Sequence, residues 1–217
     1  MKRFYVDNEI YSKCIYFNFS HKIVYKIFYG RKNMKCKKLF KYDIMGVFII
    51  FILGCLWHFL YNMLGENIII GLIAPVNESM WEHWKLGIYP ILIYSIIEYK
   101  FVKEEANNFW FSKFISIIVF DIVCFSLTGL WHGLFKNANS TLSLIVDIGA
   151  YFIGILVAQI ISYMISCKTT ENKSLKHIAI IGIVLQIIIF TVFTFNPPRY
   201  EYFKDGITDE YGIYKLK

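Results

Sequence analysis

The stretch that decides the fold is IMGVFIIFILGCLWHFLYNM, Ile44–Met63. It carries no Lys, Arg, Asp or Glu, and about 20 apolar residues are what an α-helix needs to cross a hydrocarbon core of about 30 Å. Four later stretches are also long and largely apolar: Trp81–Tyr99, Trp110–Phe135, Leu142–Cys167 and Ile178–Phe195. The sequence therefore predicts an all-α fold, a multi-pass transmembrane helical bundle of about five spans.

The composition agrees with a membrane chain. The 217 residues have a mean hydropathy of +0.48, and 18% of them are charged, against about 25% in soluble domains. The first residues, MKRFYVDNEIYSKC, contain no apolar core of the roughly 7–15 residues that a removable signal peptide requires. We therefore expect the first span itself to anchor the chain.

Basic residues predict the orientation of the spans. Eleven of the 23 Lys and Arg residues precede Ile44, and an excess of such residues marks the cytoplasmic side. We therefore expect the amino terminus inside and the carboxyl terminus outside. The net charge of +7 then indicates contact with anionic headgroups, so membrane lipids are the expected partners and nucleic acid is not.

The chain divides into three predicted regions: a basic juxtamembrane arm over 1–43, a transmembrane helical domain over 44–196 and an extracytoplasmic tail over 197–217. The apolar piece NIIIGLIAPV, residues 67–76, is too short to span a membrane and contains Pro75. It predicts a short re-entrant or interfacial segment after the first span. A model with six spans is the structural alternative.

The cysteines predict neither disulfides nor metal binding. Their number is odd and no two of them form a CxxC pair, whereas disulfide frameworks show even numbers and structural zinc sites show short spacings. We therefore expect the cysteines to be small packing residues; they are Cys14, Cys36, Cys55, Cys124 and Cys167.

The uncommon polar residues of the spans gather near the end that we predict to face outward. This set comprises His58, Glu78, Glu82, His83, His132 and Asp147. Local structure explains some of them. Ser79 and Glu82 match the S-x-x-E capping box, with Asn77 as an alternative cap, and carboxylates in a first helical turn interact favourably with the helix dipole. Tryptophans near the same boundary are typical of a membrane interface.

Together, these residues also predict a metal site. Glu78 and Glu82 are spaced as neighbours on one helical face, and His83 follows about 100° further round. His58 and His132 come from other spans. Imidazole and carboxylate groups are ligands of Zn²⁺, which can activate a bound water for hydrolysis. The spacing matches neither H-E-x-x-H nor the E-x-x-H of di-iron bundles.

Asp121 is a separate candidate, midway along the third predicted span. An ionised carboxylate there costs several kcal/mol unless it is paired or hydrated. Gln186, Ser126 or Thr128 could be its hydrogen-bond partner. Two readings stay open: Asp121 handles protons or cations, or it is a protonated contact between helices.

Three strings resemble the DUF6512 family of small integral membrane proteins from clostridia and their relatives. They are HFLYNMLGEN (58–67), GLIAPVNESMWEHWKLGIYPILIYSIIEY (71–99) and FTFNPPRYEYFKDGITDEYGIY (193–214). The resemblance runs from about Gly46 to the carboxyl terminus. The residues before it extend beyond the family's usual start, and Gly206 stands where a proline is expected.

The resemblance implies a multi-pass protein of a Gram-positive plasma membrane and supplies no activity. The family strings include much of the polar set and the exit from the last span, namely His58, Asn77, Glu78, Trp81, Glu82, His83, Asn196, Pro197 and Pro198.

The sharpest functional hypothesis is a metal-dependent hydrolase or transferase site at the outer membrane interface, acting on a lipid-phase or headgroup substrate. Its predicted ligands for a divalent metal such as Zn²⁺ are His58, Glu78, His83 and His132. Its predicted general base is Glu82.

Two alternatives stay open, and Asn77, Asp121 and Asp147 are further candidate site residues. In the first, the protein is a small-solute or ion carrier that uses Asp121 at the midplane, with the outer cluster as its vestibule. So few spans per chain would then favour a homo-oligomer. In the second, it is a non-catalytic membrane assembly partner whose outer polar face and basic inner arm bind another membrane protein.

Overall fold

The computed structural model describes residues 34–135 and 139–213, and within these ranges the fold is helical, apart from one isolated antiparallel bridge between Lys204 and Tyr211. The elements in chain order are α2 (Met34–His58), α3 (Leu60–Met63), α4 (Ile68–Gly71), α5 (Met80–His83), α6 (Lys85–Val102), α7 (Phe109–Leu134), α8 (Ser140–Lys168), α9 (Lys173–Phe195) and the 3-10 helix η1 (Glu201–Phe203). The predicted all-α bundle is confirmed.

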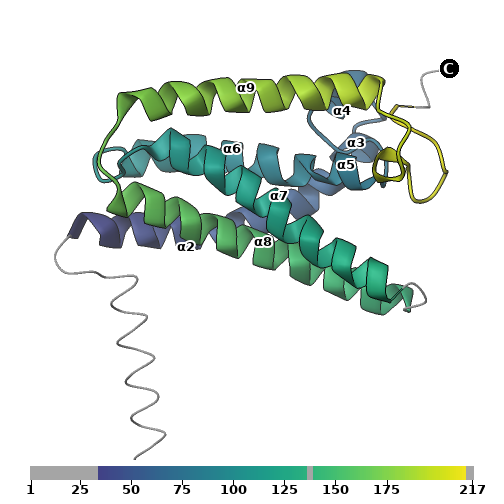
Figure 1. The fold of residues 1–217 in the computed structure, drawn as a ribbon, viewed down its shortest axis with the longest axis horizontal. Coiled ribbons are helices and arrows are strands. Elements are labelled where there is room, and N and C mark those ends of the chain that lie inside the picture. Colours follow the sequence, from purple (N-terminus) through teal and green to yellow (C-terminus); the bar gives the residue numbers. More distant parts are fainter. Residues whose placement is uncertain (1–33, 136–138, 214–217) are drawn as a thin grey trace, which may run out of the picture.

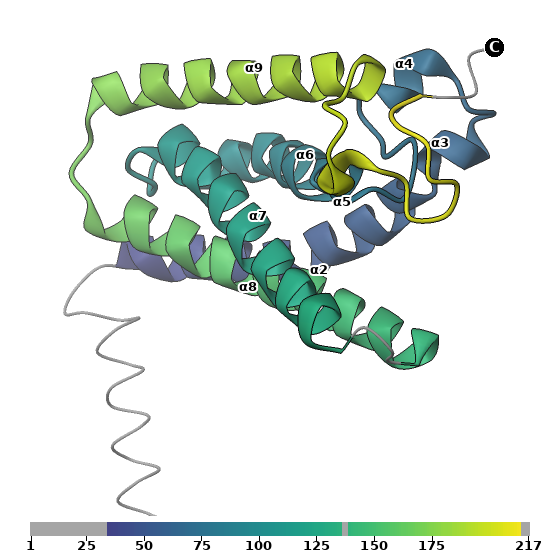
Figure 2. The ribbon, with the colours of Figure 1, turned by 45° about the vertical axis from the view of Figure 1, so that its right-hand side comes forward.

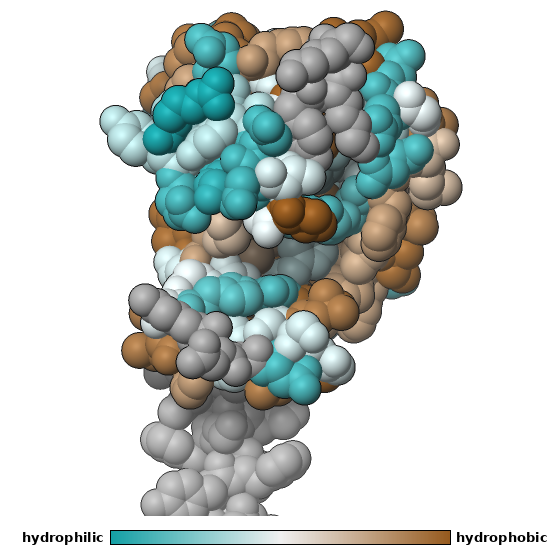
Figure 3. Space-filling view, turned by 90° about the vertical axis from the view of Figure 1, so that its right-hand side faces the viewer, coloured by the Kyte–Doolittle hydropathy of each residue, from teal (hydrophilic) through white to brown (hydrophobic). Residues whose placement is uncertain are grey.

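The long helices pack around α6, which lies between α9 on one side and α2 with α8 on the other (Figure 1). α7 and α8 run antiparallel, and the end of α7 and the start of α8 diverge from the rest of the bundle (Figure 2). The one-turn helices α3, α4 and α5 gather with η1 where α2 and α9 finish. We call this end of the bundle the loop end. Seen end on, it carries many polar side chains, with apolar ones along the sides of the molecule (Figure 3).

Four helices are long and apolar enough to cross a membrane: α2 from Cys36, α7, α8 and α9. Their outer faces expose aliphatic side chains such as Ile52, Ile122 and Ile181, which suit contact with lipid chains. The chain is therefore a multi-pass membrane protein. Which end faces the cytoplasm stays a prediction from the basic residues.

Helix α6 differs from the other long helices. The predicted span over Trp81–Tyr99 divides at Trp84 into α5 and α6, and α6 carries Lys85, Glu98 and Lys100. Lys85 and Glu98 are completely buried, because α6 occupies the interior of the bundle. Neighbouring helices can pair its charges there, whereas lipid cannot. Among the described residues, a more polar helix thus packs in a bundle with four long apolar ones, mainly against α2 and α7, while Ile96, Ile97 and Phe101 on its other face stay exposed.

Buried ion pairs tie α6 to its neighbours. The Lys113 ammonium of α7 lies 2.9 Å from Asp43 Oδ1 of α2 and 2.7 Å from Glu98 Oε2 of α6. At the opposite end of α6, Lys85 Nζ lies 2.7 Å from Glu82 Oε2. Removing one partner of such a pair leaves an uncompensated buried charge, so these contacts strongly constrain how the helices pack.

The segment 67–76 does not span the bundle. It forms the single turn of α4 and then a loop, and core side chains bind its free carbonyls. Lys85 Nζ donates to Gly71 O at 2.7 Å, and the Tyr89 hydroxyl donates to Leu72 O at 3.0 Å. Irregular backbone at membrane depth is tolerated when protein groups satisfy it in this way. The predicted non-spanning segment is confirmed, and residues 34–135 and 139–213 contain four candidate spans, so the six-span alternative is not observed there.

The first long helix starts earlier than the sequence indicates. α2 begins at Met34, ten residues before the predicted start at Ile44, so residues 34–43 are helical. Asp43 is buried inside the bundle as part of α2, because the ion pair with Lys113 compensates its charge. The remainder of the predicted basic arm, 1–33, lies outside the described residues.

The tail after α9 folds back over the loop end. Ile213 N donates to Thr194 O at 3.1 Å, and Asn77 Nδ2 donates to Gly212 O at 3.1 Å. Gly212 has a φ of 61°, and a Cβ atom there would collide with Thr194 O. Glycine is favoured at this position on both grounds. The described part of the tail therefore belongs to the structure around the polar cluster.

A disulfide joins Cys36, at the start of α2, to Cys167, near the end of α8. The expectation that all cysteines are packing residues is wrong for this pair, whereas Cys55 and Cys124 are free thiols. Cys14 lies outside the described residues. The two residues are 131 positions apart, so no short spacing reveals them. Only the packing of α2 against α8 brings them together.

Candidate metal centre

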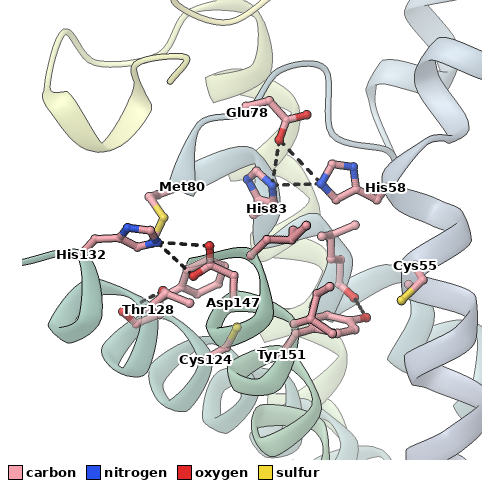
Figure 4. Close-up of a pocket in the computed structure, with 15 residues that line it drawn as sticks. Cys55, His58, Glu78, Met80, His83, Cys124, Thr128, His132, Asp147 and Tyr151 are labelled. Carbon is pink, nitrogen blue, oxygen red and sulfur yellow. Dashed lines mark hydrogen bonds and ion pairs between the residues drawn. The ribbon is translucent and has the colours of Figure 1, made fainter. Parts of the chain in front are cut away.

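Three side chains with metal-ligating atoms converge at the loop end. His58 ends α2, His83 ends α5, and Glu78 lies in the loop before α5. His83 Nε2 lies 3.2 Å from His58 Nε2 and 3.3 Å from Glu78 Oε2, and His58 Nε2 lies 3.6 Å from the same oxygen (Figure 4). The three residues form one potential metal-binding group. We call them the His–Glu cluster.

Local hydrogen bonds determine where α5 begins. Ser79 Oγ accepts from Glu82 N at 3.2 Å, and Asn77 Oδ1 accepts from Ser79 N at 2.9 Å. The predicted cap at Ser79 is present, but Asn77 rather than Glu82 accepts from the Ser79 amide. Because Glu78 precedes the helix, it does not share a helical face with Glu82. The i,i+4 spacing of these two glutamates therefore does not place their side chains next to each other.

The backbone also orients His83. The Ser79 carbonyl accepts a hydrogen bond from His83 Nδ1 at 2.7 Å. In a neutral ring, this bond holds the proton on Nδ1 and leaves the lone pair of Nε2 directed at the cluster. Metal-bound histidines usually have such a partner on the other ring nitrogen. His83 is thus held in the tautomer that a metal ion requires.

The carboxyl-terminal tail holds Glu78 from the other side. Glu78 N donates to Asp205 Oδ1 at 3.1 Å, and Asp205 is buried. Asp205 also accepts from Ile207 N and from the Thr208 hydroxyl, so it is firmly placed. The sequence does not predict this role of Asp205. The Asp205-Gly206 turn signal marks the position, but nothing local links it to a residue 127 positions away.

Glu78 and His83 stabilise each other's charged forms. The hydrogen bond from His83 lowers the pKa of Glu78 below its usual 4.5, against the effect of burial. Burial alone would lower the pKa of His83, but its hydrogen bonds with Glu78 and the Ser79 carbonyl outweigh burial and raise that pKa above the usual 6.5. The metal-free cluster therefore favours a proton on His83, where a metal ion would compete with it.

The His–Glu cluster lines one end of a pocket of about 380 Å³ between α2, α5, α6, α7 and α8. Other polar lining groups come from Thr128, His132 and Asp147. The apolar part of the lining includes Leu86, Phe125, Leu144 and Ile148. A concave site with a few convergent polar groups and a mainly apolar wall is typical of small-molecule binding.

A second polar pair lies across the pocket from the cluster. His132 Nε2 lies 3.0 Å from Asp147 Oδ1 and 3.1 Å from Asp147 Oδ2, and the pair joins α7 to α8 (Figure 4). His132, predicted as a fourth metal ligand, is thus outside the three-residue cluster. Asp147, predicted as a further candidate, is its partner. A histidine oriented by a carboxylate is suited to accepting a proton.

Glu82, the predicted general base, does not line the pocket. It is buried, and it accepts hydrogen bonds from Lys85 Nζ at 2.7 Å, from Val76 N at 3.1 Å and from the Thr194 hydroxyl at 3.1 Å. These bonds join α5, α6, α9 and the loop before α5. The contacts of Glu82 are those of a structural ion pair.

Asp121 also lies apart from the pocket lining. It is buried next to Gly87 of α6, and within the described part of the chain its Oδ1 has no hydrogen-bond partner. Gln186 Oε1 is likewise without one, and Thr128 donates to Phe125 O. None of these observations pairs Asp121 with a partner that the sequence suggested.

The chain matches a protein-family model. Residues 31–213 match a family model described as a family of unknown function (DUF6512). The chain belongs to the DUF6512 family. The match confirms the resemblance and begins before Gly46, so part of the expected extension lies within the DUF6512 region. It covers the His–Glu cluster, the pocket and the described tail. No curated protein and no solved structure matches the chain.

Proposed function

We propose that this DUF6512 protein is a metal-dependent hydrolase or transferase whose centre lies at the membrane interface. The observation that carries the proposal is the convergence of His58 Nε2, Glu78 Oε2 and His83 Nε2 at mutual distances of 3.2, 3.3 and 3.6 Å beside a pocket. A location at the interface is supported by His58 being the last residue of a helix long enough to span.

The three distances suit a tetrahedral divalent ion such as Zn²⁺. Zinc bonds of about 2.1 Å at tetrahedral angles place neighbouring ligand atoms roughly 3.4 Å apart. Two histidines and one glutamate are also a known ligand set of catalytic zinc, in which the remaining position is open to water or substrate. The open side of the His–Glu cluster would face the pocket that it lines.

A bound ion would supply Lewis acidity and would lower the pKa of a bound water to about 7. Side chains of the protein would carry out the proton transfers. His132, held by both oxygens of Asp147, would accept the proton of the water and return it to the leaving group. We assign this role to His132 instead of Glu82, because Glu82 is engaged in its buried ion pair with Lys85.

Metal analysis of the detergent-purified protein tests the proposal. The parent should hold a near-stoichiometric amount of zinc, manganese or iron, and the Glu78→Gln/His83→Ala double variant should hold none. His177→Ala is a matched control, because His177 is an exposed histidine of α9 outside the pocket lining. Circular dichroism should show equal helix content in all three. A folded parent that binds no metal even after incubation with zinc would overturn the proposal.

A second candidate function is a proton or cation carrier, and the burial of Asp121 without a hydrogen bond to Oδ1 from any described residue favours it. An acid inside a membrane bundle is a candidate coupling site. A flux in proteoliposomes that Asp121→Asn abolishes would support the carrier. Equal flux through both proteins would exclude this role for Asp121. The variant should retain its metal, so the two candidates are separable.

A further inference from the structure

We propose that the pocket binds the hydrocarbon chain of a membrane amphiphile, which enters sideways from the lipid between α2 and α8. Its carboxylic or phosphoric ester would then lie at the His–Glu cluster. The part of this inference that concerns the ester rests on the proposed function. The part that concerns the chain rests on the pocket itself.

The pocket is polar at one end and mainly apolar toward its base. The His–Glu cluster lies at the top in the close-up, and Cys124 and Tyr151 lie at the base (Figure 4). Leu86 and Phe125 also line it. An amphiphile has the same division, with a polar headgroup and an apolar chain. A wholly polar solute would leave these apolar side chains without suitable contacts.

The pocket also shares residues with the apolar outer surface. Cys55 of α2 and both Leu144 and Ile148 of α8 line the pocket and are exposed. Ile52 and Ile145, on the same two helices, are exposed as well. Both helices are long and apolar enough to span a membrane, so these side chains would face lipid. The hydrocarbon chain of an amphiphile could therefore pass from the lipid into the pocket without crossing water.

The base of the pocket is closed. The Tyr151 hydroxyl of α8 donates to Leu86 O of α6 at 3.1 Å. On the α2 side, a Cβ atom on Gly54 would collide with that hydroxyl, so glycine is needed for α2 to approach α8 here. A volume of about 380 Å³ is near the lower end of the range of about 300–1,000 Å³ for small-molecule sites. These features favour one chain rather than a complete two-chain lipid.

The polar end favours an ester as the reacting group. A divalent ion keeps net positive charge beside the single carboxylate of Glu78, so it would attract an ester oxygen. The water oxygen would form a bond to the carbonyl carbon or to phosphorus, and the bond from that atom to the leaving oxygen would break. The proton that His132 removes from the water would pass to the leaving oxygen. Water is the only co-reactant.

Native mass spectrometry of the detergent-purified protein tests the inference with two single-chain probes. 1-Palmitoylglycerol carries a carboxylic ester, and hexadecylphosphocholine carries a phosphodiester. Ile148→Trp would narrow the pocket, whereas Ile145→Trp places the same bulk on the outer face of the same helix. We expect Ile148→Trp to weaken binding about tenfold, as overpacking a filled site does. Ile145→Trp should bind like the parent.

The outcomes separate the two proposals. Equal binding by the parent and both variants, or binding of neither probe, would overturn the chain site, even in a protein that holds zinc. Binding that depends on Ile148 without any uptake of zinc would support the chain site and overturn the proposed function. If both hold, zinc should strengthen binding in the parent and not in His83→Ala. The probe that is cleaved then identifies the ester.

Discussion

His83 Nδ1 lies 2.7 Å from the carbonyl oxygen of Ser79, one helical turn earlier. The same serine caps α5 through its hydroxyl, which accepts from Glu82 N. One residue therefore determines both where the short helix starts and which nitrogen of His83 is available to a metal ion. The two functions use different atoms of Ser79, so substitution can separate them.

Ser79→Ala should weaken the helix cap and retain the tautomer of His83. Loss of the hydroxyl should cost about 1 kcal/mol, while the backbone carbonyl still accepts from Nδ1. We expect a lower thermal midpoint with zinc affinity close to that of the parent, measured by competition with a chelator. Asn172→Ala removes the cap of α9 and is the control for a loss of similar size elsewhere. Zinc affinity as low as that of His83→Ala would contradict this division of roles.

Zinc should bind more tightly as the pH rises through the neutral range. The pKa of His83 is raised above 6.5 and that of Glu78 is lowered below 4.5, so the proton that competes with zinc resides on His83. Below the pKa of His83, the dissociation constant should increase about tenfold for each unit of falling pH. Isothermal titration at several pH values measures this slope. A flat profile would show that His83 Nε2 is not a ligand.

In the metal-free protein, His83 and Glu78 should make the stability of the fold depend on pH. The raised pKa of His83 stabilises the fold below pH 6.5, and this contribution is lost as the pH rises through the folded-state pKa. The lowered pKa of Glu78 stabilises the fold above pH 4.5, and this contribution is lost as the pH falls. Both contributions are present between pH 4.5 and 6.5. Thermal unfolding with a chelator should therefore show that Glu78→Gln/His83→Ala loses most stability in that window.

Glu82→Gln should destabilise the protein strongly without removing the metal. Lys85 would remain buried without its carboxylate partner, and breaking one side of a buried pair costs about 3–5 kcal/mol. Thermal unfolding should detect this, and Glu82→Gln/Lys85→Met should recover part of the loss. Metal content should stay at the parental level in the folded fraction. A stable Glu82→Gln variant without activity would instead return Glu82 to the role of general base.

His132→Ala should retain zinc and lose activity toward a cleaved ester. General acid–base groups typically contribute about 10²–10⁴-fold to the rate, and His132 lies outside the three-residue cluster. Asp147→Asn should have a smaller effect in the same direction, because it orients His132. Stopped assays on zinc-loaded protein measure both. Loss of zinc from His132→Ala would instead make His132 a ligand, as the sequence predicts.

Cys36→Ser should lower stability under oxidising conditions. The disulfide to Cys167 closes a loop of 131 positions, and the chain-entropy model assigns such a loop up to about 5 kcal/mol. Thermal midpoints with and without reductant should differ for the parent and coincide for Cys36→Ser, with Cys55→Ser as the control. The basic residues predict that this end faces the cytoplasm, where disulfides rarely persist. Alkylation of Cys36 and Cys167 in intact cells would therefore also test the predicted orientation, because free thiols at these positions are expected if this end of the bundle faces the cytoplasm.

The candidate site could be predicted only in part. His58, Glu78 and His83 are found together as expected, because helix lengths place the end of α2 and the start of the next helical segment at similar depth. Glu82 does not lie beside Glu78, since the i,i+4 spacing of the two residues brings them together only in a continuous helix. The helix begins after Glu78. The capping residue decides where the helix starts to within a few positions, and a change in that start changes the direction in which the neighbouring side chains point.

The sequence by itself determined that the chain is a multi-pass helical membrane protein with a non-spanning segment after its first span. These features depend on the length and polarity of continuous stretches, which are local. Only the tertiary structure decided that Cys36 meets Cys167, that Asp205 supports Glu78 and that His132 pairs with Asp147. Each of these contacts joins elements whose relative placement depends on helix packing and loop geometry, which the order of residues along one helix does not contain.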